Sequence, residues 1–183
     1  NSPNSKLLYI PENHISKKRP LEMIFLDVGQ GDGSILISAE EGRDDERIVV
    51  IDAGKGDHMM RFLNGRFRTY TQSFQYSAAN ITQPDSGHYQ GFRDVFNNPL
   101  IGCDKVFHNV LMELPGTADR TYDKLGGAEK ASNGKSYIKD LIETDAAARA
   151  RYPEKPDHDD YWFPELMRRA VAYNKIKSFS LLS

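Results

Sequence analysis

The chain of 183 residues has few of the features that mark secreted, membrane or nucleic-acid-binding proteins. It contains a single cysteine, Cys103, so an internal disulfide is excluded, and the apolar context LIGCDKVF predicts a small buried residue. No apolar run approaches the roughly 18 residues of a membrane-spanning helix, and the N-terminus lacks a signal peptide's apolar core. A formal net charge of −2 gives no reason to expect a polyanionic partner. We therefore expect a cytoplasmic protein without a membrane partner.

What the chain does contain is the composition of one ordinary globular domain, with 39% hydrophobic and 27% charged residues. No internal repeat or low-complexity tract divides it. Residues 1–21 hold three prolines and the basic run KKR, which predict a lead-in segment with one short strand at 7–10. The domain itself is predicted to span residues 22–183.

The most informative stretch follows the lead-in. Three apolar runs of strand length are separated by the sequence GQGDG and by an acidic loop, and both separators are typical of turns. The stretch therefore predicts a three-stranded antiparallel meander, with strands at 23–28, 35–38 and 48–51. The glycines nearly match a dinucleotide-binding fingerprint, but that fingerprint requires a helix directly after them. The short β-branched run at 34–37 predicts a strand instead, which excludes this interpretation.

The rest of the chain alternates between patterns of helical and of strand length. Helical spacing of apolar residues, with capping residues before and Gly or Pro after, predicts the helices. Short β-branched runs predict the strands, and a polar, glycine-rich excursion occupies 115–134. The predicted helices are 58–64, 88–97, 137–151 and 161–173, on one side of a mostly antiparallel sheet that adds strands at 77–82 and 104–110. A further short strand is predicted at 175–182.

The sequence FLDVGQGDGSILI followed by VVIDAG closely resembles the opening of the metallo-β-lactamase-like domain of ComEC-type competence proteins and their soluble relatives. The resemblance implies an α/β fold, in which residues 22–183 form the N-terminal half of an αββα sandwich: a mixed, mostly antiparallel sheet with helices on one face. It also implies a hydrolase that acts on phosphodiesters or other esters. Such enzymes bind one or two ions, usually zinc or manganese, which acidify a water molecule into a nucleophile.

A second motif of that family, T-H-P-D-x-D-H-x-x-G, is only partly present. The matching residues are Thr82, Pro84, Asp85, His88 and Gly91. Gln83 replaces the first histidine of the motif, and Gly87 replaces its second aspartate. The resemblance also implies that the GQGDG turn, with Asp32, lies beside the metal site. It leaves Asp85 and His88 as the candidate metal ligands.

The two departures weaken this site. A glutamine amide oxygen is a poor zinc ligand beside imidazole, and glycine offers no side chain at all. Beyond His108, no segment resembles the aspartate and histidine ligands that the second half of the family's fold supplies. We therefore expect a truncated, catalytically impaired member of the family with no tightly bound ion. The alternative is a non-catalytic binding or structural module, in which Asp85 caps a helix and His88 is an ordinary surface residue.

The open face of a half sandwich predicts a partner. In the complete fold a second sheet covers the face opposite the helices, and leaving a large apolar patch in water forgoes about 25 cal/mol per Å². We expect a homo-oligomer or a partner chain that covers this sheet face. A nucleic-acid partner, bound by Arg61, Arg66 and Arg68 with nearby aromatic residues, is the less favoured alternative because the net charge is −2.

Overall fold

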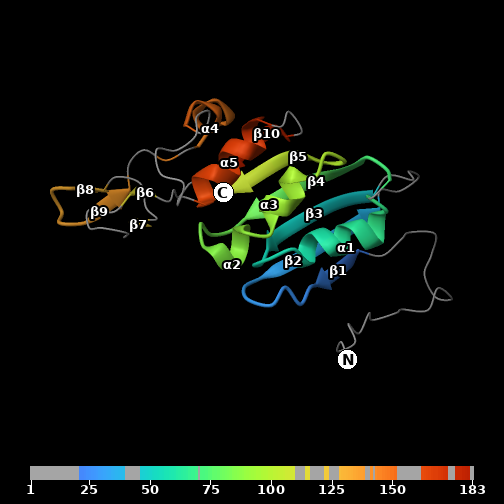
Figure 1. The fold of residues 1–183 in the computed structure, drawn as a ribbon. Coiled ribbons are helices and arrows are strands. Elements are labelled where there is room, and N and C mark those ends of the chain that lie inside the picture. The colour runs from blue at the N-terminus through green and yellow to red at the C-terminus, as the bar shows by residue number, and fades with distance from the viewer. Residues whose placement is uncertain are drawn as a thin grey trace.

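The computed structural model describes residues 21–39, 46–69, 71–109, 114–115, 122–123, 128–138, 141, 143–151, 162–172 and 176–181. The predicted lead-in segment and its strand lie outside these residues, apart from Leu21. The principal sheet has six strands in the order β1-β2-β3-β4-β5-β10 (Figure 1). Its strands are β1 (Glu22–Phe25), β2 (Gly33–Ala39), β3 (Glu46–Ala53), β4 (Phe74–Ile81), β5 (Ile101–His108) and β10 (Ile176–Leu181).

The first three strands form the antiparallel meander that the sequence predicts. Met23 of β1 pairs with Leu36 of β2, and Leu36 pairs with Val49 of β3. A strand, β2, follows the GQGDG turn directly, so the dinucleotide-binding interpretation stays excluded. Ile35 and Ile37 are buried while their neighbours on β2 are half-buried, which identifies the face of this strand that packs into the core.

The strands β3, β4, β5 and β10 run parallel to one another, which corrects the prediction of a mostly antiparallel sheet. The reason lies in the connections. Helix α1 (His58–Phe67) joins β3 to β4, and helices α2 (Ser86–Tyr89) and α3 (Phe92–Asn97) join β4 to β5. Each helical crossover returns the chain to the same end of the sheet, as parallel pairing requires. The fold is therefore α/β with a mixed six-stranded sheet.

The first helix is longer than predicted. The sequence predicts its end at Gly65, but α1 continues to Phe67 and is followed by Arg68 in the left-handed conformation, with φ of 54°. An exposed glycine inside a helix costs only about 1 kcal/mol relative to alanine. The buried side chains of Met59 and Leu63 hold α1 in the core, so this local cost does not end the helix.

The second predicted helix, 88–97, is broken into α2 and α3. At the break, Gly91 donates its N–H to the carbonyl oxygen of Gly54 (2.9 Å). A Cβ at position 91 would lie 2.2 Å from the carbonyl oxygen of Ala53, so only glycine fits this close approach to the end of β3. The prediction of one continuous helix is wrong because this backbone contact is tertiary and leaves no periodic pattern in the sequence.

The C-terminal part matches the predictions unevenly. Helix α5 (Trp162–Ala172) and β10 confirm the helix expected at 161–173 and the strand expected at 175–182. The helix expected at 137–151 is wrong at its start, because residues 137 and 138 belong to a local hairpin, and the described helix is α4 (Asp145–Arg151). Short antiparallel pairs join β6 (Leu114–Pro115) to β7 (Tyr122–Asp123) and β8 (Ala128–Lys130) to β9 (Ser136–Ile138).

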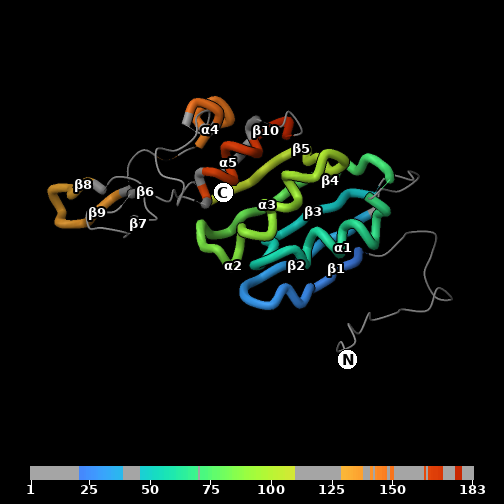
Figure 2. Tube along the Cα trace, viewed as in Figure 1, coloured from blue at the N-terminus to red at the C-terminus, as the bar shows by residue number. Residues whose placement is uncertain are grey.

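The core lies between the sheet and a row of helices. Helices α1, α3 and α5 lie side by side across one face of the sheet, and α4 lies against β10 (Figures 1 and 2). Among the helices described, none has the length and apolar character needed to cross a bilayer. The largest fully buried side chains include Tyr76, Phe92, Phe163, Ile35, Met59 and Leu63.

Candidate functional site

Polar side chains gather where β3, β4 and β5 end. These parallel strands finish at Ala53, Ile81 and His108, so the loops that follow them meet at one edge of the sheet. The GQGDG turn lies at the same edge, because Gly33 at the start of β2 pairs with Ala53. In open α/β sheets, ligands bind outside the carboxyl ends of the parallel strands. This edge is therefore the candidate functional site.

Asp52 is the centre of the site. It is 2% exposed and has a left-handed backbone, with φ of 51°. Its carboxylate accepts hydrogen bonds from the backbone N–H of Thr82 (2.8 Å) and from the Thr82 hydroxyl (2.6 Å). The side-chain amide of Asn109, which follows β5, donates to the Thr82 carbonyl oxygen (2.8 Å). The ends of three neighbouring strands are thus tied together around one buried carboxylate.

His88 extends this network from α2. Its Nδ1 lies 2.9 Å from Asp52 Oδ2, 3.3 Å from Thr82 Oγ1 and 3.8 Å from Asp32 Oδ2, and its side chain is only 16% exposed. Because a carboxylate only accepts hydrogen bonds, Nδ1 carries the ring hydrogen and donates a hydrogen bond to Asp52. The other ring nitrogen, Nε2, then keeps its lone pair in the neutral imidazole. That nitrogen is able to bind a cation or to accept a proton from a ligand.

The GQGDG turn packs directly on α2, the helix that carries His88. The backbone N–H of Asp32 donates to the carbonyl oxygen of Gly87 (3.1 Å). A Cβ on Gly31, whose φ is +101°, would lie 1.8 Å from that same oxygen, so this position of the turn requires glycine. A Cβ on Gly87 would lie 3.2 Å from the Cα of Gly31. A side chain at position 87 therefore has to push the turn outward by a few tenths of an ångström.

The two predicted ligands, Asp85 and His88, have different surroundings. Asp85 is exposed at the N-cap position of α2, and its backbone carbonyl accepts hydrogen bonds from His88 (2.9 Å) and Tyr89 (3.2 Å), but its side chain makes no capping hydrogen bond. Asp85 thus occupies the N-cap position expected in the second interpretation, without a side-chain capping hydrogen bond. The part of that interpretation in which His88 is an ordinary surface residue is wrong, because His88 is hydrogen-bonded to the buried Asp52.

The described residues do not complete a zinc or manganese centre. Zinc sites use three or four protein ligands. Across the described ranges, no three or more His, Cys, Asp or Glu side chains are grouped so as to hold an ion. Gln83 is exposed and Gly87 is packed on the turn, so neither supplies the imidazole or carboxylate of the family motif. The donors present do not fit a tightly held ion.

Sequence reasoning missed Asp52 and His108 as residues of this edge. Asp52 directly follows the apolar run 48–51. A carboxylate at the end of a buried strand is the sequence signal that could have identified it as a site residue. His108 ends β5 opposite Ile81 and is 2% exposed, and burial lowers its pKa from 6.5 to about 4. Nothing in the local sequence distinguishes this buried histidine from an exposed one.

Exposed side chains of α1 form their contacts outside the Asp52 network. His58 is exposed, and its Nδ1 lies 3.0 Å from the carbonyl oxygen of Asp27. Two arginines of the nucleic-acid alternative also contact other groups: Arg61 forms an ion pair with Asp57 one helical turn away (2.8 Å), and Arg66 places its guanidinium over the ring of Phe67. These contacts do not involve Asp52, Thr82 or His88.

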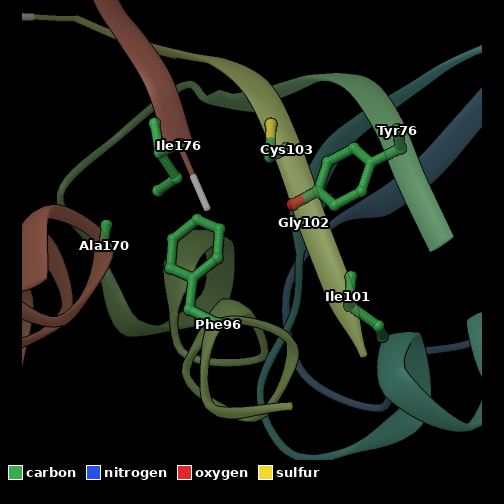
Figure 3. A pocket seen from close by; sticks show the side chains of 7 residues that line it. All are labelled: Tyr76, Phe96, Ile101, Gly102, Cys103, Ala170 and Ile176. Carbon is green, nitrogen blue, oxygen red and sulfur yellow. The ribbon is translucent and has the colours of Figure 1, made fainter. Parts of the chain in front are cut away.

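The opposite end of the parallel strands holds a small apolar cavity, of about 10 Å³ (Figure 3). The side chain of Tyr76 is 1% exposed, and its Oη points toward the cavity beside the Cys103 thiol, a weak hydrogen-bonding group. The neighbouring thiol of Cys103 donates to the Lys105 carbonyl oxygen (2.8 Å), and burial raises its pKa to about 12. This confirms the predicted burial of Cys103 and makes its thiol unreactive. The cavity is lined by Tyr76, Phe96, Ile101, Gly102, Cys103, Ala170 and Ile176.

Comparison with known proteins finds no match for this chain, whether among family models, curated proteins or solved structures. The class of site is therefore defined by its own geometry. It is a buried carboxylate hydrogen-bonded to a histidine, at the carboxyl ends of parallel strands in a mixed α/β sheet. In such a pair the carboxylate orients the imidazole and selects its tautomer.

Proposed function

We propose that this chain is a member of a metal-dependent hydrolase family with a metallo-β-lactamase-like fold, and that it is catalytically impaired as it stands. The observation that carries the proposal is the hydrogen bond between Asp52 and His88, which are 36 residues apart in the sequence. This bond joins the VVIDAG segment to the TQPDSGH segment, and the resemblance to the family rests on both. The antiparallel meander at the start of the domain also supports the proposed fold.

In this proposal Asp52 is a positioning residue. It holds His88 in the tautomer whose Nε2 lone pair is available, and Thr82 fixes the carboxylate through two hydrogen bonds. In the family, bound metal ions supply the activated water. Because Gln83 and Gly87 contribute neither imidazole nor carboxylate here, hydrolysis of a phosphodiester or another ester should be slow.

A second candidate, a non-catalytic binding or structural module, is favoured by the contact between Gly31 and Gly87. The turn packs against the position at which the family motif has a carboxylate, and the Asp32 N–H binds the Gly87 carbonyl oxygen (3.1 Å). This contact packs α2 against the turn as part of the fold. In this candidate the pair of Asp52 and His88 only attaches α2 to the end of β3.

Metal content and hydrolysis by the purified chain separate the two candidates. For the impaired hydrolase we expect less than one equivalent of zinc or manganese. Added zinc or manganese should support slow hydrolysis of bis(p-nitrophenyl) phosphate, and His88→Ala should reduce that rate to background. His58→Ala is the matched control, because it removes an exposed imidazole outside the network. If the unaltered chain with added metal hydrolyses the substrate no faster than buffer alone, the chain is the non-catalytic module. A stoichiometric ion with rapid turnover would contradict both candidates.

A further inference from the structure

The sequence contains two Asn-Gly dipeptides, and the fold gives them opposite surroundings. Asn64-Gly65 lies inside α1, where Asn64 is 8% exposed and its Oδ1 accepts a hydrogen bond from the Thr69 hydroxyl. Asn133-Gly134 lies in the exposed loop between β8 and β9, outside the principal sheet (Figure 1). The side-chain carbon of an asparagine is open to attack by the next backbone nitrogen, and a glycine there has no Cβ to hinder the approach. The two dipeptides therefore share this chemistry but differ in accessibility.

The loop between β8 and β9 is a tight turn with open space around its glycine. Gly134 donates its N–H to the Ala131 carbonyl oxygen (2.9 Å), and its φ is +78°. Ala131 donates to the Lys135 carbonyl oxygen (2.9 Å), which closes the loop. Hairpin loops of this kind place a left-handed glycine directly after the turn. No atom of the described residues lies within 4 Å of the position that a Cβ of Gly134 would take, so solvent reaches the dipeptide.

The side-chain amide of Asn133 is held by two neighbouring groups. Its Oδ1 accepts a hydrogen bond from the backbone N–H of Lys135 (2.9 Å), and its Nδ2 donates to the Tyr137 hydroxyl oxygen (3.3 Å). When a nucleophile adds to an amide carbon, negative charge develops on the amide oxygen, and a donor already aimed at that oxygen stabilises the charge. A hydroxyl beside the amide nitrogen is able to give it a proton as it leaves. The hairpin thus surrounds the Asn133 Cγ with groups that assist its substitution.

We propose that Asn133 is a site of intramolecular deamidation, in which the hairpin modifies itself. This inference does not depend on the proposed function. The hydrogen bond from Gly134 to Ala131 first opens, as bonds in exposed turns do at low cost. The Gly134 nitrogen then forms a bond to Asn133 Cγ and gives its proton to water. The Cγ–Nδ2 bond breaks, and the nitrogen leaves as ammonia with a proton from the Tyr137 hydroxyl, which regains one from water.

Water completes the reaction by opening the cyclic imide at residue 133. Addition of water at Cγ leaves an aspartate, and addition at the backbone carbonyl carbon leaves an isoaspartate. Both products carry a carboxylate in place of the neutral amide, so the hairpin gains one negative charge. In isoaspartate the side-chain methylene becomes part of the backbone, and the spacing that closes the turn between Ala131 and Lys135 is lost. The modification therefore changes both the charge and the shape of this hairpin.

Incubation of the purified chain at mildly alkaline pH tests the site, with ion-exchange chromatography and peptide mapping by mass spectrometry as readouts. In the folded chain we expect Asn133 to be converted and Asn64 to react about a hundredfold more slowly or less, because α1 has to open before Asn64 reacts. In urea, where α1 is unfolded, the two dipeptides should react at similar rates. An intact Asn133, or equal conversion of the two residues in the folded chain, would overturn the proposal.

The variant Tyr137→Phe tests the proton donor. It keeps the exposed ring and removes the hydroxyl beside Asn133 Nδ2, so conversion of Asn133 in the folded chain should slow about three- to tenfold. In urea the same variant should react at the rate of the unaltered chain, because the hairpin contact is absent there. Tyr76→Phe is the matched control, since it removes a tyrosine hydroxyl in the core. An unchanged rate in folded Tyr137→Phe would overturn the role given to this hydroxyl.

Discussion

Two buried polar groups at opposite ends of the parallel strands, the Asp52 carboxylate and the Tyr76 hydroxyl, have different surroundings. At the carboxyl end, the Asp52 carboxylate is bound by Thr82 and His88, and Asn109 secures Thr82 in turn. At the amino end, the Tyr76 hydroxyl points into an apolar cavity, where its polar neighbour is the Cys103 thiol (Figure 3). A thiol is a weak hydrogen-bonding group, and burying a polar group is tolerated cheaply only when it is well hydrogen-bonded. The Asp52 network therefore stabilises the fold, whereas the Tyr76 hydroxyl contributes little.

The backbone of Asp52 illustrates the same difference. A left-handed conformation costs a residue other than glycine of order 1–2 kcal/mol. Asp52 adopts it, with φ of 51°, because three hydrogen bonds to its carboxylate hold it there. At the amino end, no described residue of the cavity lining has a positive φ. Strain and hydrogen bonding thus occur together at the candidate site.

The largest effect is expected at the carboxyl end. Asp52→Ala should lower the free energy of unfolding by about 3–5 kcal/mol, because it leaves the donors of Thr82 and His88 without their buried acceptor. Asp52→Asn should cost less, since asparagine tolerates a positive φ and keeps one acceptor oxygen. Urea denaturation measures both. Asp57→Ala is the control, because it removes only a surface ion pair with Arg61, worth about 0.5 kcal/mol. If Asp52→Ala lowered the free energy of unfolding by less than about 1 kcal/mol, the Asp52 network would not be a main stabilising feature of the fold.

Acid should weaken the same end through His108. Burial lowers the pKa of His108 from 6.5 to about 4, so the unfolded chain binds a proton before the folded chain does. Stability is therefore fully present above about pH 6.5 and falls as the pH drops toward about 4. At about 1.4 kcal/mol per pKa unit, the loss approaches about 3 kcal/mol. Denaturation over this pH range should show a shallower decline in His108→Gln, whereas His58→Gln should follow the unaltered chain. If the free energy of unfolding fell equally steeply with pH in the two variants, His108 would not be the cause of the loss of stability in acid.

The smallest effect, with the opposite sign, is expected at the amino end. Tyr76→Phe keeps the ring that stacks on Phe74 and removes a buried hydroxyl whose polar neighbour is the Cys103 thiol. The free energy of unfolding should rise by up to about 1 kcal/mol, because a thiol is a weak hydrogen-bond partner and the substituted side chain no longer buries a polar atom. Thermal and urea denaturation both measure this change. Tyr137→Phe, on an exposed ring, should leave stability unchanged. A clear loss of stability in Tyr76→Phe would mean that the hydrogen bond to Cys103 outweighs the cost of burying the hydroxyl.

Local pattern alone determined several elements of this protein. The meander, the strand after the GQGDG turn, the helix at α5, the strand at β10 and the burial of Cys103 all follow from periodicity, turn residues and apolar context. These features depend on neighbours in sequence, and short-range propensities report on them directly. Of the two ligands that the resemblance implied, His88 lies in the hydrogen-bond network at the end of β4.

Only the tertiary structure decided the parallel half of the sheet, the break at Gly91 and the partner of His88. The direction of β4 and β5 depends on where the connecting helices return the chain. Gly91 interrupts a helix because the end of β3 passes within contact distance of it. Asp52 meets His88 across 36 residues of sequence. Each of these results from segments that approach one another in space, and a one-dimensional pattern records the residues but not their distance.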